Sequence, residues 1–165
     1  AETLSRLGGV ADACRQPVIV TGAARRALEA AFLGTCYRAQ LPDGPVDLRI
    51  GVGNARLDQW LAEVGAHDWA FISADNPGAR AAGAQFNRRR REALAKRVHA
   101  AGWTAVSGEG IPAAGNWLPE KSLLIAGIDR FEAERLARAF DQLAIIVGQR
   151  GGVARLHWLD SEAQH

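Results

Sequence analysis

The sequence has few of the residues on which common structural and catalytic signatures depend. It contains two cysteines, Cys14 and Cys36, with no CxxC pair and no neighbouring histidine, which argues against a disulfide framework and for reduced thiols. Its four histidines are scattered without the spacing of metal ligands, so neither a metal site nor a cofactor is expected. The motifs of P-loop proteins, serine hydrolases and zinc peptidases are also absent.

Long apolar stretches are missing as well. No run approaches the roughly 18 residues needed to cross a bilayer, because Arg, Asp or Gly interrupts each candidate. The opening residues lack the basic-then-apolar pattern of a secretory signal. With 165 residues, of which 48% are hydrophobic and 23% charged, the chain has the composition of one ordinary globular domain. We therefore expect a cytoplasmic protein without a membrane segment.

Positive charge is concentrated in one segment. The formal net charge is only +2, but residues 76–100 carry seven Arg and Lys residues against one Glu, a net of +6 that leaves −4 for the rest. Four of these residues, at 88–91, are consecutive and sweep nearly a full helical turn, so they cannot form one flat basic stripe. The preferred interpretation is a solvated helix face, and a nucleic-acid-binding surface is the alternative.

The order of periodic segments indicates an α/β or α+β fold, with a mixed β-sheet and about four helices in a single globular domain at residues 21–165, after an N-terminal lead-in at 1–20. Helices are predicted at 22–33, 55–64, 85–101 and 130–140, with Thr21, Asn54 and Asp129 as N-caps. Strands are predicted at 35–39, 46–51, 69–74, 103–106, 122–128, 143–147 and 153–159. The apolar run 69–74 is predicted to be covered on both faces, and the glycine-rich stretch 107–115 to be a loop.

The end of the strand at 69–74 is the first candidate site. Four turn-forming residues, 75–78, follow it directly, and ligands often bind beyond the ends of strands. In the next helix, Asn87 and Arg90 continue the stripe defined by Leu94, so the inward face of that helix begins polar. A polar start with free helix amides suits a phosphate or carboxylate. Alternatively, both side chains only cap and tie down the turn.

Glu120 is the best candidate for a catalytic carboxyl group. It precedes a strongly apolar strand and follows Trp117 closely, so burial could raise its pKa and suit it to proton transfer. A structural ion pair with an arginine is the alternative. Gln142 lies between a predicted helix and a predicted strand, where it could bond a ligand or cap the helix.

Several of these positions belong to a recognisable combination of motifs. They are Thr35-x-Tyr37, Leu48-Arg49-Ile50-Gly51, Ser73-Ala74-x-Asn76-Pro77, Asn87-x-x-Arg90-x-x-x-Leu94, Trp117-x-Pro119-Glu120-x-Ser122 and Gln142-x-Ala144. Together they resemble the bacterial family of domain of unknown function 3293, over about residues 28–148. The family more often has Thr at the position of Ser73 and lacks an equivalent of Leu118. The resemblance implies a small bacterial cytoplasmic domain, supplies no reaction, and groups the motif residues into one site.

The leading hypothesis is a site for a small anionic or nucleotide-like ligand. In it, Asn76 and the turn backbone shape the site, and Arg90 holds the anion. The other ligand-binding candidates are Tyr37, Ser73, Asn87 and Gln142, with Glu120 as the candidate for proton transfer. Two alternatives stay open: a nucleic-acid-binding module that uses residues 76–100, and a protein-interaction domain without catalysis. Whether the protein is an enzyme, and its oligomeric state, are left open.

Overall fold

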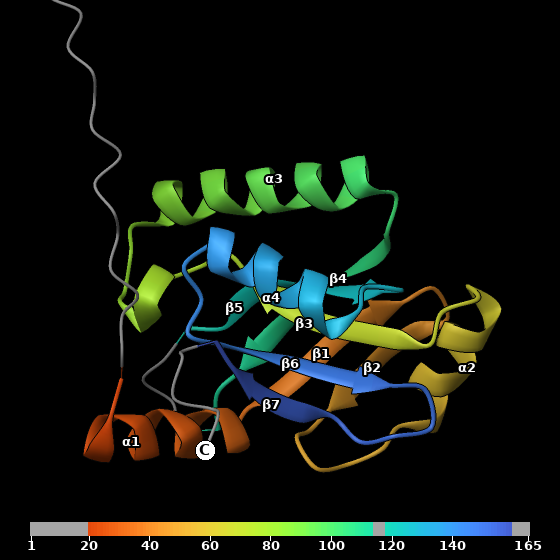
Figure 1. Ribbon diagram of the computed structural model, residues 1–165, viewed down its shortest axis with the longest axis horizontal. Coiled ribbons are helices and arrows are strands. Elements are labelled where there is room, and N and C mark those ends of the chain that lie inside the picture. Colours follow the sequence, from red (N-terminus) through yellow and green to blue (C-terminus); the bar gives the residue numbers. More distant parts are fainter. Residues whose placement is uncertain (1–19, 114–117, 160–165) are drawn as a thin grey trace, which may run out of the picture.

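Seven strands form one sheet in the computed structural model, which describes residues 20–113 and 118–159 (Figure 1). The strands are β1 (Cys36–Leu41), β2 (Gly44–Leu48), β3 (Asp68–Ser73), β4 (Thr104–Ile111), β5 (Glu120–Ala126), β6 (Ala144–Gln149) and β7 (Arg155–Trp158). Their order across the sheet is β2-β1-β4-β5-β3-β6-β7. All ladders between these strands are antiparallel.

Four helices and one short turn accompany the sheet in the described ranges. They are α1 (Gly22–Leu33), α2 (Ala55–Glu63), α3 (Ala84–Ala101), α4 (Arg130–Ala139) and the 3₁₀ turn η1 (Pro77–Ala79). The predicted fold class, α/β or α+β with a β-sheet and about four helices, is confirmed. The sheet was expected to be mixed, whereas the ladders between its strands are antiparallel. None of the described helices is both long and apolar enough to span a bilayer.

The sheet curls until its two edges meet. Just beyond β2, Ile50 forms a parallel bridge with Ala154, which directly precedes β7. The amide of Gly51 donates to the Ala154 carbonyl at 2.7 Å, and the Ala154 amide donates to the Val52 carbonyl at 3.3 Å. Because β2 and β7 are the two edge strands, these bonds join the edges at one end of the curled sheet.

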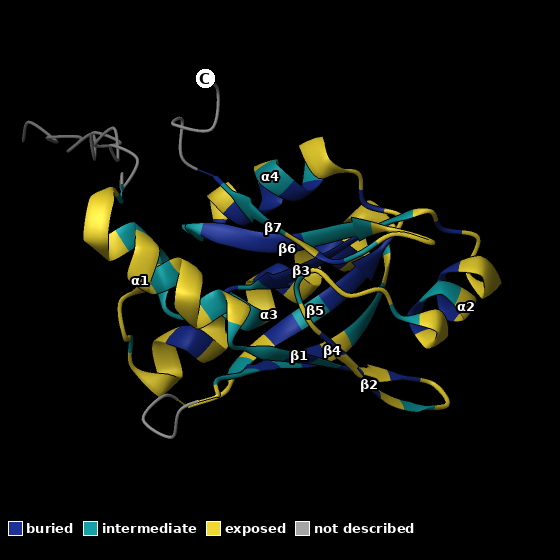
Figure 2. Ribbon diagram, turned by 90° about the horizontal axis from the view of Figure 1, so that it is seen from below, coloured by how far each residue is buried: buried dark blue, intermediate teal, exposed yellow. Residues whose placement is uncertain are grey.

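The two faces of the curled sheet support two hydrophobic cores, an inner one that α2 joins and an outer one beneath α3 and α4. Buried residues follow the central strands (Figure 2). Successive residues of β3 alternate between the two cores, as a strand requires: Trp69 and Phe71 belong to the inner core, and Ala70 and Ile72 to the outer one. Helix α2 contributes Leu57, Trp60 and Leu61 to the inner core, whereas α3 and α4 supply Leu94, Val98, Ala133, Leu136 and Ala137 to the outer core. The prediction that this strand is covered on both faces is confirmed.

Helix ends follow the predicted capping residues in two of three cases. Asn54 caps α2 by accepting from the Leu57 amide at 2.9 Å, and Asp129 caps α4 by accepting from the Glu132 amide at 2.8 Å. Thr21 occupies the N-cap of α1, but its side chain makes no capping bond. The predicted boundaries of these helices agree with the structure to within a residue or two.

The loop predicted at residues 107–115 is wrong over its first half. Strand β4 continues to Ile111, with glycines at 108 and 110 beside aromatic rings; a Cβ has no room at Gly108 and would make an ordinary contact at Gly110. A Cβ at Gly108 would lie 2.7 Å from the Phe71 ring, and one at Gly110 would lie 3.7 Å from the Tyr37 ring. These glycines therefore continue the strand rather than break it. Apart from Val20, the predicted lead-in lies outside the described residues, as does Trp117.

Candidate functional site

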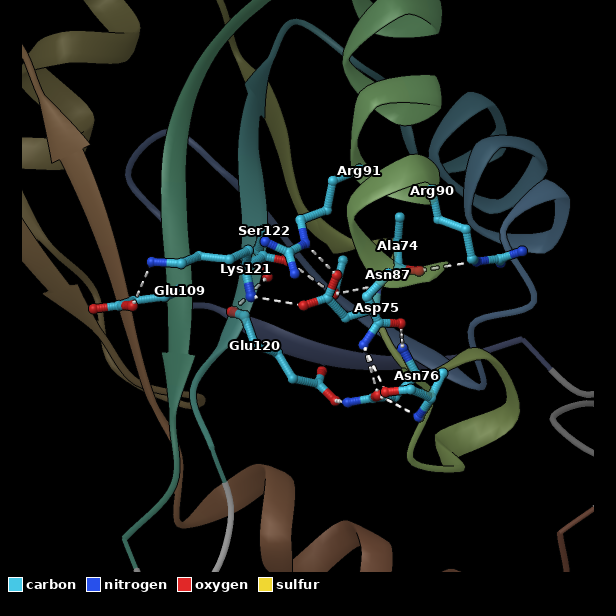
Figure 3. A network of polar contacts seen from close by, with 12 residues as sticks. Ala74, Asp75, Asn76, Asn87, Arg90, Arg91, Glu109, Glu120, Lys121 and Ser122 are labelled. Atoms are coloured by element: carbon cyan, nitrogen blue, oxygen red, sulfur yellow. Dashed lines mark hydrogen bonds and ion pairs between the residues drawn. The ribbon is translucent and has the colours of Figure 1, made fainter. Parts of the chain in front are cut away.

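Asn76 is the centre of a polar network where β3 ends (Figure 3). Its backbone is left-handed, with φ 47°. Its amide donates to Oδ1 of Asn87 at 3.0 Å, and its own Oδ1 accepts from Nδ2 of Asn87 and from the Ala82 amide, both at 3.0 Å. Its Nδ2 donates to Oε1 of Glu120 at 2.8 Å. Buried Asn87 on α3 thus fixes Asn76, and Asn76 fixes one oxygen of Glu120.

Glu120 starts β5 on the inner face of the sheet. Leu124 belongs to the inner core, and strand alternation places Ser122 and Glu120 on the same face. Partial burial raises the pKa of the Glu120 carboxyl above its ordinary value of 4.5. The Asn76 hydrogen bond opposes that rise, and the negative charge of Asp75 adds to it. Glu120 is therefore a carboxyl group whose proton is held more tightly than in water.

Tyr37 lies in the same cross-strand row as Glu120. Gly110 of β4 pairs with Tyr37 of β1 on one side and with Glu120 of β5 on the other. Because Gly110 has no side chain, the phenol and the carboxyl group are the side chains on either side of it in this row. The Tyr37 hydroxyl donates to the Phe32 carbonyl of α1 at 3.1 Å. Burial, together with the charge of Glu120, raises the pKa of Tyr37.

Asp75 is a site residue that the sequence indicates only as part of a turn. It is 5% exposed and accepts from Nε of Arg91 at 2.8 Å and from the Lys121 amide at 3.2 Å. Ser73 supports this arrangement, since its hydroxyl donates to the Lys121 carbonyl at 2.9 Å and accepts from the Asp75 amide at 3.0 Å. The sequence carried a signal for this role of Asp75. It is an acidic residue at the end of a buried strand, and Arg91 lies at the border of the buried helix stripe.

Arg90 and Gln142 bind the backbone around this turn. Arg90 donates from Nε to the Ala74 carbonyl at 3.0 Å and from Nη2 to the Phe140 carbonyl. Its Nη2 also lies 3.4 Å from Oδ2 of Asp141. Gln142 donates from Nε2 to the carbonyls of Asp75, at 3.1 Å, and Phe140, at 3.2 Å. These are the contacts of the tie-down alternative, and the anion-holding role of Arg90 stays a prediction.

The backbone of this region is strained. Among the described residues, the non-glycine positions with positive φ are Asn76, Ala79 and Asp141, at 47°, 57° and 55°. The Gly78 amide donates to the Asp141 carbonyl at 2.7 Å, so all three belong to two loops that meet at the end of β3. Such conformations are costly and concentrate at functional sites.

The stretch that matches a known family includes most of this network. Residues 72–145 match the family model described as Protein of unknown function (DUF3293). This stretch, which we call the DUF3293 segment, is similar to that family over less than half of the chain. The resemblance expected from the motifs is thereby confirmed over this stretch. No curated protein and no solved structure matches the chain.

The DUF3293 segment contains six of the seven predicted site residues, and Tyr37 lies outside it. The structure brings these six together, because each lies in residues 73–76 or hydrogen-bonds to that stretch. Asp75, Arg91 and Gly110 also belong to the DUF3293 segment and to the site. Sequence reasoning missed the roles of these three residues.

Two other kinds of site are less favoured by the structure. Across the described parts of the chain, no cluster of three or more His, Cys, Asp or Glu side chains could hold a metal ion. A surface hollow of about 390 Å³ lies away from the DUF3293 network, and Arg38, Asp47 and Arg56 contribute to its lining. Arg38 is bonded there to Asp47, and Arg56 to the Pro45 carbonyl. The hollow therefore offers no free cationic group, and the Glu120 network is the better candidate.

Proposed function

We propose that the protein binds a small polar ligand at the inner-face row of Tyr37, Gly110 and Glu120. The observation that carries this proposal is the state of the Glu120 carboxyl group. Oε1 is fixed by Asn76 at 2.8 Å, whereas Oε2 has no hydrogen-bond partner among the described residues. A half-buried carboxyl oxygen that is oriented but unsatisfied favours a ligand that brings its own donor.

The nucleotide-like class fits this acceptor best. Nucleobase edges carry N–H donors that carboxylates accept, and the second oxygen of Glu120, which Asn76 does not bond, is such an acceptor. Phosphate is the weaker candidate for recognition here, because Arg90 and Arg91 already donate to Ala74, Phe140 and Asp75. The small ligand is therefore a nucleotide-like molecule that the site recognises through its base.

Glu120 is also the group that would move a proton. Its pKa is raised by burial and by the charge of Asp75, and a general acid or base works best with a pKa near the working pH. The Asn76–Asn87 pair holds one carboxyl oxygen of Glu120 in place. This contact also orients the other oxygen of the same group. We assign proton exchange with the bound ligand to this free oxygen.

A thermal-shift comparison tests the proposal. The probes are adenosine, guanosine, cytidine and uridine, with ribose phosphate and inorganic phosphate as base-free anions. A nucleoside at a hundredfold its Kd should raise the unfolding midpoint by about 5–10 °C, from roughly 2.7 kcal/mol of linkage in a domain of this size. Glu120→Gln and Gly110→Ala should abolish the shift. The first removes the carboxylate, and the second places a methyl group between Tyr37 and Glu120.

Glu29→Gln is the matched control, because Glu29 is an exposed residue of α1 and the substitution makes the same chemical change. It should leave the shift intact. A shift that survives in Glu120→Gln, or that arises from phosphate and ribose phosphate alone, would contradict the proposal. Silence of all four nucleosides would contradict it too.

A further inference from the structure

Helices α3 and α4 together form a basic layer on the outer side of the sheet (Figure 1). They carry nine Arg and Lys residues against three Glu, a net of +6. Because the whole chain has a net charge of +2, all other residues sum to −4. The charge segregation that the sequence shows along the chain is therefore also a segregation in space, with the positive charge on the helices that cover one face.

Several cations of this layer have no anionic partner. Arg90 and Arg91 are engaged internally, and Arg88 pairs with Glu92 at 3.3 Å. Arg89, Lys96 and Arg130 are exposed and form no ion pair with any residue in the described ranges. Unpaired surface cations on one face attract polyanions, since each phosphate they neutralise releases a condensed counterion.

The same two helices expose aromatic rings. Phe86 of α3 is 49% exposed and Phe131 of α4 is 67% exposed. Each lies beside an arginine: Arg90 is 5.7 Å from the Phe86 ring centre, and Arg135 is 6.0 Å from that of Phe131. Exposed aromatic rings next to guanidinium groups are the surface on which unpaired bases stack. The sequence alone does not indicate that these rings are exposed.

We infer that the outer face of α3 and α4 binds single-stranded nucleic acid. Arg89, Lys96 and Arg130 contact phosphates, and Phe86 and Phe131 stack on bases. A single strand fits better than a duplex because duplex bases are already stacked and out of reach of a surface phenylalanine. This surface lies on the opposite side of the sheet from the inner-face row of Glu120, so it is independent of the proposed small-ligand function.

The test is fluorescence anisotropy of labelled oligo(U) and oligo(dT) of about 12 nucleotides with the full chain. With the three phosphate contacts of Arg89, Lys96 and Arg130, the affinity should fall roughly twentyfold between 50 and 200 mM salt. The double variant Arg89→Glu/Lys96→Glu should weaken binding roughly tenfold or more. Phe131→Ala should weaken it about fivefold or more, because one stacking contact is lost.

The matched control is Arg150→Glu/Arg155→Glu, which makes the same change of charge at two exposed positions outside α3 and α4. It should retain affinity within about twofold at 200 mM salt, where distant charges are screened. Equal loss in this control would overturn the assignment to the helical layer. Unchanged binding of Phe131→Ala, or tighter binding of a duplex of the same length, would overturn the assignment to a single strand. Absence of binding at 50 mM salt would overturn the inference as a whole.

Discussion

A half-buried carboxyl group makes the stability of a protein depend on pH. Because the pKa of Glu120 is raised above 4.5 by burial and by Asp75, the native state binds this proton more tightly than the unfolded state does. The free energy of unfolding therefore falls as pH rises from about 4.5 through the native pKa, and this contribution is constant above it. Glu120→Gln removes the fall while keeping an oxygen that accepts from Asn76.

We expect Glu120→Gln to gain stability relative to the parent as pH rises through this window. Urea unfolding at a series of pH values measures the difference between the two proteins. Glu29→Gln serves again as the control and should follow the parent at every pH. Parallel curves for the parent and Glu120→Gln would show that the pKa of this carboxyl group is unshifted.

Asn87 is the residue on which the geometry of the site rests. It is 7% exposed, and it exchanges two hydrogen bonds with Asn76. Asn87→Ala leaves the Asn76 amide without this acceptor, so we expect a loss of about 1–3 kcal/mol in the free energy of unfolding. Gln85→Ala, an exposed change near the same helix end, should have little effect. If Asn87→Ala is as stable as the parent, the pair does not hold the turn.

At the scale of elements, glycines on neighbouring strands determine how much space the buried aromatic rings have. A Cβ at Gly148 of β6 would lie 2.5 Å from the Trp69 ring, whereas one at Gly110 would meet nothing closer than 3.6 Å. Gly148→Ala should therefore lower the free energy of unfolding by about 1–3 kcal/mol through overpacking. Gly110→Ala, the control, should change it by less than about 1 kcal/mol. Equal effects in denaturant unfolding would contradict this distinction.

The elements predicted best are those whose signals are local. The helices α2 and α4 begin with side-chain caps and bury residues at helical spacing, and both signals lie within a few positions. The predicted β4 is too short because glycines in a sequence usually indicate the end of a strand. In this strand they instead make room for side chains that pack against it. Gly108 is covered by the ring of Phe71, which lies far away in sequence. No local pattern could supply that information.

The candidate site also combines features with local sequence signals and features that depend on the tertiary structure. Asn76, Asn87 and Glu120 could be chosen one by one, because polar residues at element ends stand out against apolar neighbours. Their convergence depends on β5 pairing with β3 and on α3 packing over β5 and β4, and single-sequence reasoning does not give strand order. The ion pair between Asp75 and Arg91 was missed for the same reason, since it forms only after that packing.

For the whole molecule, the strands shared by both cores indicate that the described residues unfold as one unit. Strand β3 contributes alternate residues to the inner and outer cores, and bonds between residues 50–52 and 154 join the sheet edges. Neither core can lose its packing without exposing the sheet that supports the other. The single domain predicted from the sequence thus becomes a prediction about cooperativity.

Leu61→Ala in the inner core and Leu94→Ala in the outer core test this cooperativity. Both side chains are buried, at 0% and 2% exposure, so each substitution should lower the free energy of unfolding by about 2–5 kcal/mol. Half-exposed Leu33→Ala should have a much smaller effect. In both core variants, far-UV circular dichroism and tryptophan fluorescence should report one coincident urea transition. Separate transitions in either variant would mean that the two sides of the sheet unfold independently, and the sheet would then not couple the Glu120 network to the helical layer.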